Sequence, residues 1–166
     1  NFASSISPWI VTMDALEPFR VKGPEQSPEP LSYLQQKGEK AFDINLEVLI
    51  KPENSEETVV SRSNFKYMYW SMAQQLAHHT INGCRVNSGD MMGSGTISGP
   101  TEDSFGSMLE LSWGGQKPLK MNDGSERKFI NDNDTVIIRG FCQKDNLRIG
   151  FGEVSSKLLP AIDLKF

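Results

Sequence analysis

Two segments of the chain combine residue types that can bind or activate a small molecule. The first is residues 93–100, GSGTISGP, in which the hydroxyl side chains Ser94, Thr96 and Ser98 are interspersed with glycines. Glycine lets a ligand approach the backbone closely, and hydroxyl groups orient the polar groups of a ligand. A loop with β-bulges would use the same residues. This segment alone therefore leaves a binding site and a plain loop as equal alternatives.

The second segment is residues 107–113, SMLELSW, which places a carboxylate among apolar side chains. Leu109, Leu111 and Trp113 occupy alternate positions, so the pattern predicts a strand with Glu110 on the opposite, solvent-facing side. A carboxylate is costly to bury without a partner. If the face that carries Glu110 borders a cleft instead, the carboxylate is suited to orient a histidine or a water molecule.

Histidines and carboxylates elsewhere offer further candidates. His78 and His79 are adjacent in a helical pattern, where neighbouring side chains diverge by about 100°, so they cannot easily ligate one ion. We expect one ring to hydrogen-bond in the core and the other to face water. Asp43, Asn45 and Glu47 share one face of a strand and could hold a hard cation, but a solvated polar face explains them equally well. No serine elbow, His-Glu-x-x-His motif or phosphate-binding glycine loop occurs.

A strand and a helix are expected in the first half of the chain. Residues 42–48 alternate strictly between apolar and polar side chains, which predicts a half-buried strand. Residues 64–82 are predicted to form a helix, capped by Ser61 or Ser63 and closed by Gly83. One face of this helix carries an apolar stripe at spacings of three and four residues, which is typical of core packing: Phe65, Met68, Met72 and Leu76.

Short strands separated by turns dominate the rest of the chain. Strands are expected at 58–60, 91–98, 108–113, 119–121, 128–130, 135–142 and 147–154. A hairpin is expected at Gly114-Gly115. The fold class is therefore mainly β with one prominent α-helix (α+β), arranged as a sandwich or a rolled sheet.

Composition limits the classes of function. The chain has 166 residues, of which 37% are apolar and 23% charged, as in a globular protein. The net charge of −4 argues against nucleic-acid binding, and no apolar run approaches the roughly 20 residues that span a bilayer. Cys84 and Cys142 are expected to be free thiols in a reducing compartment, the cytoplasm. The chain begins at Asn1, which suggests a cut or processed end.

The two segments that could do chemistry also carry a family resemblance. Residues 95–100 (GTISGP) and 104–113 (SFGSMLELSW) closely resemble the signature of the fumarylacetoacetase family. Further stretches agree in order along nearly the whole chain: 6–11 (ISPWIV), 13–16 (MDAL), 42–46 (FDINL), 63–70 (SNFKYMYW) and 149–152 (IGFG). Shorter acyl-pyruvate-hydrolase relatives share the general fold but generally lack the FGSMLEL block.

The resemblance implies a metal-dependent hydrolase that splits the carbon–carbon bond of 4-fumarylacetoacetate into fumarate and acetoacetate, the last step of tyrosine and phenylalanine breakdown. A histidine oriented by a glutamate activates water, and Mg²⁺ or Ca²⁺ polarises the diketo group. By position, Glu110 is the catalytic glutamate that orients the histidine, Thr96 contacts the substrate, and Ser4 stands at a threonine of the metal site. The family usually has Gly-Thr where this chain has Ala3-Ser4; serine keeps the hydroxyl.

The resemblance also implies a domain organisation and partners. Residues 1–166 match the C-terminal part of the catalytic domain, a mixed β-sandwich roll. An SH3-like domain, the catalytic histidine, the main carboxylate ligands and a lysine are expected before Asn1. The partners are a small-molecule substrate and a second copy in a homodimer, with no nucleic acid and no membrane. The chain alone is expected to be inactive. The alternatives are a truncated relative that serves as a binding or assembly module, and another diketo-acid hydrolase of the superfamily.

Overall fold

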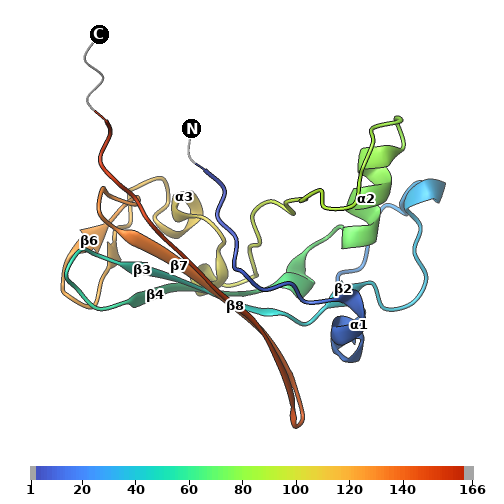
Figure 1. Ribbon diagram of the computed structural model, residues 1–166, viewed down its shortest axis with the longest axis horizontal. Helices are drawn as coiled ribbons and strands as arrows, with labels where there is room; N and C mark the ends of the chain where they lie inside the picture. Colours follow the sequence, from blue (N-terminus) through green and yellow to red (C-terminus); the bar gives the residue numbers. More distant parts are fainter. Residues whose placement is uncertain (1–2, 163–166) are drawn as a thin grey trace.

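One antiparallel sheet forms the centre of the protein. The computed structural model describes residues 3–162. Four strands are hydrogen-bonded in the order β4-β3-β7-β8, and Figure 1 shows the β7–β8 hairpin projecting away from the rest of the chain. Their bounds are β3 Asn45–Lys51, β4 Thr58–Asn64, β7 Thr135–Lys144 and β8 Leu147–Lys157. The expected strands at 42–48, 58–60, 135–142 and 147–154 are thus confirmed, apart from a break at residues 43–44.

Shorter elements surround this sheet. Two small antiparallel pairs are β1 Arg20–Val21 with β2 Ala41–Phe42, and β5 Leu119–Lys120 with β6 Glu126–Arg127. The helices are α1 Met13–Leu16, α2 Met72–Thr80 and α3 Met108–Leu111, with 3₁₀ turns η1 Glu17–Phe19, η2 Ser32–Leu34, η3 Phe65–Tyr67 and η4 Glu102–Ser104. The described residues are therefore mostly sheet with a few short helices, as the α+β prediction requires. Among them no helix is long and apolar enough to cross a membrane.

Two apolar clusters lie along β2 and β3. Alternate side chains of this stretch enter the first cluster near its start and the second near its end. The first joins α1, η1 and the β2–β3 region to β7: Leu16, Phe19, Phe42, Ile44 and Cys142. The second contains Ile50, Val60 and Met121, and Val48, Met108 and Leu111 pack against it. α3 is therefore held against the faces of β3 and β4 by Met108 and Leu111. Both side chains are partly buried, so each contributes less than the about 1.5–3 kcal/mol of full burial, and together they anchor this four-residue helix.

A buried ion pair closes the turn that precedes β7. Arg127 donates from Nε and Nη2 to the two carboxylate oxygens of Asp134, at 2.7 and 2.9 Å, and Asp134 is 1% exposed. The Asn131 backbone N–H donates to the same carboxylate at 2.9 Å. Burial acts to raise the pKa of Asp134, but the hydrogen bonds from Arg127 and Asn131 outweigh it and hold that pKa below its ordinary value.

The predicted helix at 64–82 is wrong in its first half. β4 runs to Asn64, a 3₁₀ turn follows, and α2 begins only at Met72. The cap is Ser71, which accepts from the Gln74 N–H, while the Gln74 side chain accepts from the Ser71 N–H. This reciprocal capping box starts a helix more strongly than the apolar spacing of the preceding residues. The expected positive φ of Gly83 after the helix is present, at +86°.

Three strand predictions in the second half are also wrong. Residues 91–98 and 128–130 have no strand, and residues 108–111 form α3. Gly114 and Gly115 adopt positive φ angles of +62° and +85°, but they follow α3 instead of joining two strands. Leu109 and Trp113 are exposed, whereas Leu111 is partly buried against the second cluster, so the expected two-sided alternation does not exist.

Candidate active site

Two serine hydroxyls fix the carboxylate of Glu110. Ser107 caps α3: its Oγ accepts from the Glu110 backbone N–H at 3.3 Å and donates to Glu110 Oε2 at 2.8 Å. Ser98 Oγ lies 2.9 Å from both Oε1 and Oε2, so its single proton is shared between the two oxygens. Glu110 is half-buried. The carboxylate therefore has one preferred orientation, and part of its acceptor capacity remains free for another donor.

The end of β4 holds the two segments that meet at Glu110. Ser61 Oγ donates to the Phe105 carbonyl at 2.7 Å, and Ser63 Oγ donates to the Ile97 carbonyl at 2.9 Å. The prediction that Ser61 or Ser63 caps a helix is therefore wrong, and both side chains instead hold loop carbonyls. Between the segments, the Gly106 N–H donates to Ser98 Oγ at 3.1 Å. The sheet therefore sets the register in which residues 97–99 and 104–106 lie beside each other.

A glycine allows the two segments to approach closely. A Cβ placed on Gly106 would lie 2.6 Å from the Ile97 carbonyl oxygen and 2.7 Å from Thr96 Cγ2, distances that Cβ atoms do not reach. Thr96 is therefore in contact with the backbone just before α3, and its side chain is exposed. The structure thus brings Thr96 and Glu110 into one region, joined by Ser98 and Gly106.

The region around Glu110 is an open depression with apolar walls. Its lining consists of Phe105, Leu109, Glu110, Trp113 and Gly114. Leu109 and Trp113 are 63% and 55% exposed. Lys117 Nζ lies 5.0 Å from the centre of the Trp113 ring, so an ammonium group stands at the same rim. A carboxylate beside apolar walls and a cation can orient a polar donor next to a bound organic molecule.

Ser4 lies in a different setting. It is exposed, and the residues after it run along β8, where Ser156 donates to Ser5 Oγ at 2.7 Å and Ser7 donates to the Phe151 carbonyl at 2.8 Å. Among residues 3–162 no hydrogen bond joins Ser4 to Glu110 or Thr96. Thr96 and Glu110 are thus linked through Ser98 and Gly106, whereas the contacts next to Ser4 are made with β8.

The polar face of β3 is occupied by neighbouring side chains. Asn64 Nδ2 donates to Asp43 at 2.6 Å and to Asn45 at 3.2 Å, and Lys66 lies 3.1 Å from Asp43. Glu47 pairs with Arg62 at 2.9 Å. Within the described residues no group of three or more His, Cys, Asp or Glu side chains could hold a metal ion. The placement of Ser4 at a metal site stays a prediction, and one hydroxyl alone does not bind a divalent cation.

The two histidines form separate contacts at α2. His78 Nδ1 lies 2.9 Å from the Tyr33 hydroxyl, and His79 Nε2 lies 3.3 Å from Cys84 Sγ. They therefore diverge as expected, but both rings are exposed, so neither hydrogen-bonds within the core. Both hydrogen bonds lie at α2, whereas Glu110 is on α3.

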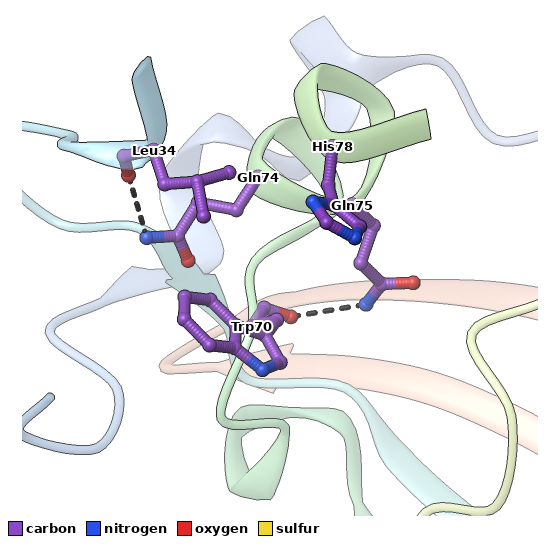
Figure 2. Close-up of a pocket in the computed structure, with 5 residues that line it drawn as sticks. All are labelled: Leu34, Trp70, Gln74, Gln75 and His78. Atoms are coloured by element: carbon purple, nitrogen blue, oxygen red, sulfur yellow. Dashed lines mark hydrogen bonds between the residues drawn. The ribbon is translucent and has the colours of Figure 1, made fainter. Parts of the chain in front are cut away.

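A cavity of about 200 Å³ lies beside α2, lined by Leu34, Trp70, Gln74, Gln75 and His78. Figure 2 shows the Gln74 side chain reaching toward Leu34 and the Gln75 side chain reaching toward Trp70. Gln74 Nε2 donates to the Leu34 carbonyl at 2.8 Å, and Gln75 Nε2 donates to the Trp70 carbonyl at 3.0 Å. These amides are already engaged in tying α2 to η2 and to residue 70. We interpret the cavity as part of the packing of α2.

Comparison with known proteins identifies the family to which the chain belongs. Residues 1–158 match the family model described as "Fumarylacetoacetate (FAA) hydrolase C-terminal". The chain belongs to the fumarylacetoacetate hydrolase family. It is 57% identical over 164 residues to a fumarylacetoacetase of Dictyostelium discoideum, covering 97% of this chain and 38% of that protein. A Homo sapiens fumarylacetoacetase is 54% identical over 98% of this chain and 39% of its own length. An Oryza sativa subsp. japonica fumarylacetoacetase is 51% identical over 98% of this chain and 38% of its own length.

This member of the fumarylacetoacetate hydrolase family matches only part of the length of its relatives. The chain spans less than two fifths of the length of the curated relatives it matches. The similarity therefore establishes the family, while the reaction of the whole relatives is a proposal for this chain.

Ser98 and Ser107 are residues of the candidate site that the sequence interpretation did not single out as partners of Glu110. Ser107-x-x-Glu110 has the spacing of a helix N-cap and its third residue, which predicts a helix start and places the two side chains together. That signal was available in the sequence. The contact between Ser98 and Glu110 spans a loop, and no local pattern predicts it.

Proposed function

We propose that this chain contributes to the active site of an enzyme that hydrolyses the carbon–carbon bond of 4-fumarylacetoacetate, giving fumarate and acetoacetate. The observation that carries the proposal is the carboxylate of Glu110, which two hydroxyls orient at the edge of a depression with apolar walls. Membership of the fumarylacetoacetate hydrolase family supports the same reaction.

Glu110 acts in this proposal by orienting a histidine that removes a proton from water. A carboxylate has about four acceptor positions, and Ser98 and Ser107 use part of them. The remaining positions can accept the N–H of an imidazole, which fixes its tautomer and leaves its other nitrogen as the base. Glu110 is then a positioning residue, because it acts through the histidine.

Thr96 is proposed to donate a hydrogen bond to the substrate. Its hydroxyl is on an exposed residue, and the contact between Gly106 and the Thr96 methyl group restrains the side chain. Ser63 holds the next residue through its carbonyl. Such restraint lowers the entropy that substrate binding must overcome.

The metal is proposed to be Mg²⁺ or Ca²⁺, bound mainly by carboxylates that the described residues do not supply. When bound it would polarise the diketo group of the substrate. Ser4 is proposed as a hydroxyl near that site. We further propose that the four-stranded sheet is part of a β-sandwich roll, that the enzyme is a homodimer, and that it serves tyrosine and phenylalanine breakdown in the cytoplasm, where Cys84 and Cys142 stay reduced.

A chimeric enzyme tests the proposal. Residues 1–166 would replace the matching C-terminal stretch of the Dictyostelium discoideum fumarylacetoacetase, to which they are 57% identical. We expect the chimera to hydrolyse 4-fumarylacetoacetate with Mg²⁺ or Ca²⁺, and Thr96→Val to raise KM more than it lowers kcat. Glu56→Gln, which changes an exposed carboxylate, is the matched control and should leave kcat and KM unchanged.

Two results would contradict the proposal. A folded chimera that does not hydrolyse 4-fumarylacetoacetate would favour a binding or assembly role, and faster turnover of another diketo acid would favour a different hydrolase of the superfamily. The 166-residue chain assayed alone is expected to show no turnover.

A further inference from the structure

A thiol and an imidazole meet at the C-terminal end of α2. Cys84 Sγ lies 3.3 Å from His79 Nε2, and both residues are exposed. After the helix, the Gly83 N–H donates to the Thr80 carbonyl at 2.9 Å, and the Asn82 side chain accepts from the Cys84 N–H at 3.2 Å. These contacts fold the chain back, so that the thiol is held beside the last helical turn.

We propose that Cys84 and His79 form a nucleophile–base pair, and that Cys84 is a site of covalent modification by α,β-unsaturated carbonyl compounds. A nucleophile needs a base within hydrogen-bonding reach, and the exposed pair satisfies that requirement. The proposal does not depend on the hydrolytic reaction proposed above, because it uses neither Glu110 nor Thr96.

The addition is balanced without an oxidant or a leaving group. Nε2 of His79 accepts the thiol proton, and the thiolate sulfur forms a bond to the β-carbon of the unsaturated compound. The π electrons of the carbon–carbon double bond move to give an enolate. The α-carbon of the enolate then takes the proton back from the imidazolium, which leaves a neutral thioether and regenerates His79. The imidazolium is transient at the C-terminal end of α2, where the helix favours a positive charge.

The second cysteine provides an internal contrast. Cys142 is fully buried in the first apolar cluster, and burial, assisted by the charge of Asp43, raises the pKa of its thiol to about 11. It is therefore both inaccessible and protonated at neutral pH. Modification of the folded chain should be confined to Cys84, since Cys142 is the other of the two cysteines in the sequence.

Labelling with N-ethylmaleimide, an α,β-unsaturated dicarbonyl, tests the proposal. The rate at each cysteine of the folded chain would be measured at neutral pH by peptide mass spectrometry. A thiol without a base is only a few per cent thiolate at this pH. A base that converted it completely to thiolate could therefore accelerate labelling by at most about 30-fold. We expect His79→Ala and His79→Gln to slow the labelling of Cys84 by about tenfold, within that limit. His78→Ala, which removes the adjacent exposed ring bound to Tyr33, should leave the rate unchanged.

Chemical rescue separates a base from a structural role. Free imidazole should accelerate the labelling of Cys84 in His79→Ala more than in the wild-type chain, because it supplies the missing base. The proposal is overturned if His79→Ala and His79→Gln label at the wild-type rate, if His78→Ala slows labelling equally, or if imidazole restores nothing while the helical circular-dichroism signal is retained.

Discussion

The hydrogen bond between Ser98 and Glu110 should contribute to the stability of the chain, which can be measured as its free energy of unfolding. Ser98→Ala removes the hydroxyl that lies 2.9 Å from both oxygens of the carboxylate. A single proton is shared between those oxygens, so the two short distances count as one charge-assisted hydrogen bond. Such bonds contribute about 1.5–3 kcal/mol, and the half-buried position of Glu110 favours the lower end. We therefore expect Ser98→Ala to lower the free energy of unfolding by about 1.5 kcal/mol.

A double-mutant cycle isolates this contact from other effects of the substitution. Ser98 also accepts from the Gly106 N–H, but Gly106 is exposed and water can replace that acceptor. The unfolding free energies of wild type, Ser98→Ala, Glu110→Ala and the double variant would be measured by urea titration with tryptophan fluorescence. The expected coupling is about 1–1.5 kcal/mol. With a slope near 2 kcal/mol/M, Ser98→Ala should shift the midpoint by roughly 0.7 M.

Ser94→Ala is the matched control for this cycle, because the Ser94 hydroxyl donates only to the carbonyl of its neighbour Gly95. It should change the free energy of unfolding by less than about 0.5 kcal/mol, as surface substitutions do, and therefore the midpoint by less than about 0.25 M. The reasoning is refuted if the two single effects add to the double effect within about 0.3 kcal/mol, since additivity means that Ser98 and Glu110 do not interact.

Three further predictions follow from other parts of the structure. Asp134→Asn should destabilise the chain by about 3–5 kcal/mol in urea at neutral pH, because Arg127 keeps its buried charge without a counter-ion. The pKa of Asp134 is lowered in the folded state, so wild-type stability should fall as pH drops below about 4, and Asp134→Asn should remove that part of the acid dependence. Ser71→Ala should cost about 1 kcal/mol, measured by thermal unfolding, through loss of the cap of α2; no loss would contradict the capping role. Gly106→Ala should lower kcat/KM of the chimera even at temperatures well below its melting temperature, where the protein stays folded, because a Cβ there displaces the Thr96 segment. An unchanged kcat/KM would contradict this placement.

The sequence predicted the main sheet because its strands carry clear local patterns. Residues 42–48 alternate strictly, and the alternate apolar side chains Phe42, Ile44 and Val48 do reach the two clusters of the core. The apolar spacing at 64–82 was misleading, since Phe65 begins the 3₁₀ turn η3 and Met68 follows that turn, both before the start of α2. Hydrophobic spacing alone does not distinguish a helix from an irregular segment packed against a sheet; the Ser71-x-x-Gln74 cap marks the true start.

The site itself was predictable only in part. Residue types alone marked Glu110 and the segment that contains Thr96 as candidates, and a family resemblance supplied their expected roles. The proximity of the two residues arises from contacts far apart in sequence, such as Ser61 with the Phe105 carbonyl. Alternation around Glu110 predicted a strand, but residues 108–111 form α3. A run this short fits both the two-residue period of a strand and the 3.6-residue period of a helix. The partner Ser98 is brought to Glu110 by the fold of a loop, which no local propensity encodes.

The most direct test of the account is the kcat of the chimera for 4-fumarylacetoacetate with and without the carboxylate of Glu110. Glu110→Gln keeps the shape of the side chain and the hydroxyl contacts but removes the charge that orients and stabilises the histidine. Positioned acid–base groups contribute about 10²- to 10⁴-fold, so the account predicts that kcat falls at least about 100-fold, with KM changed little. A Glu110→Gln chimera whose kcat stays within about twofold of the parent would contradict the central claim.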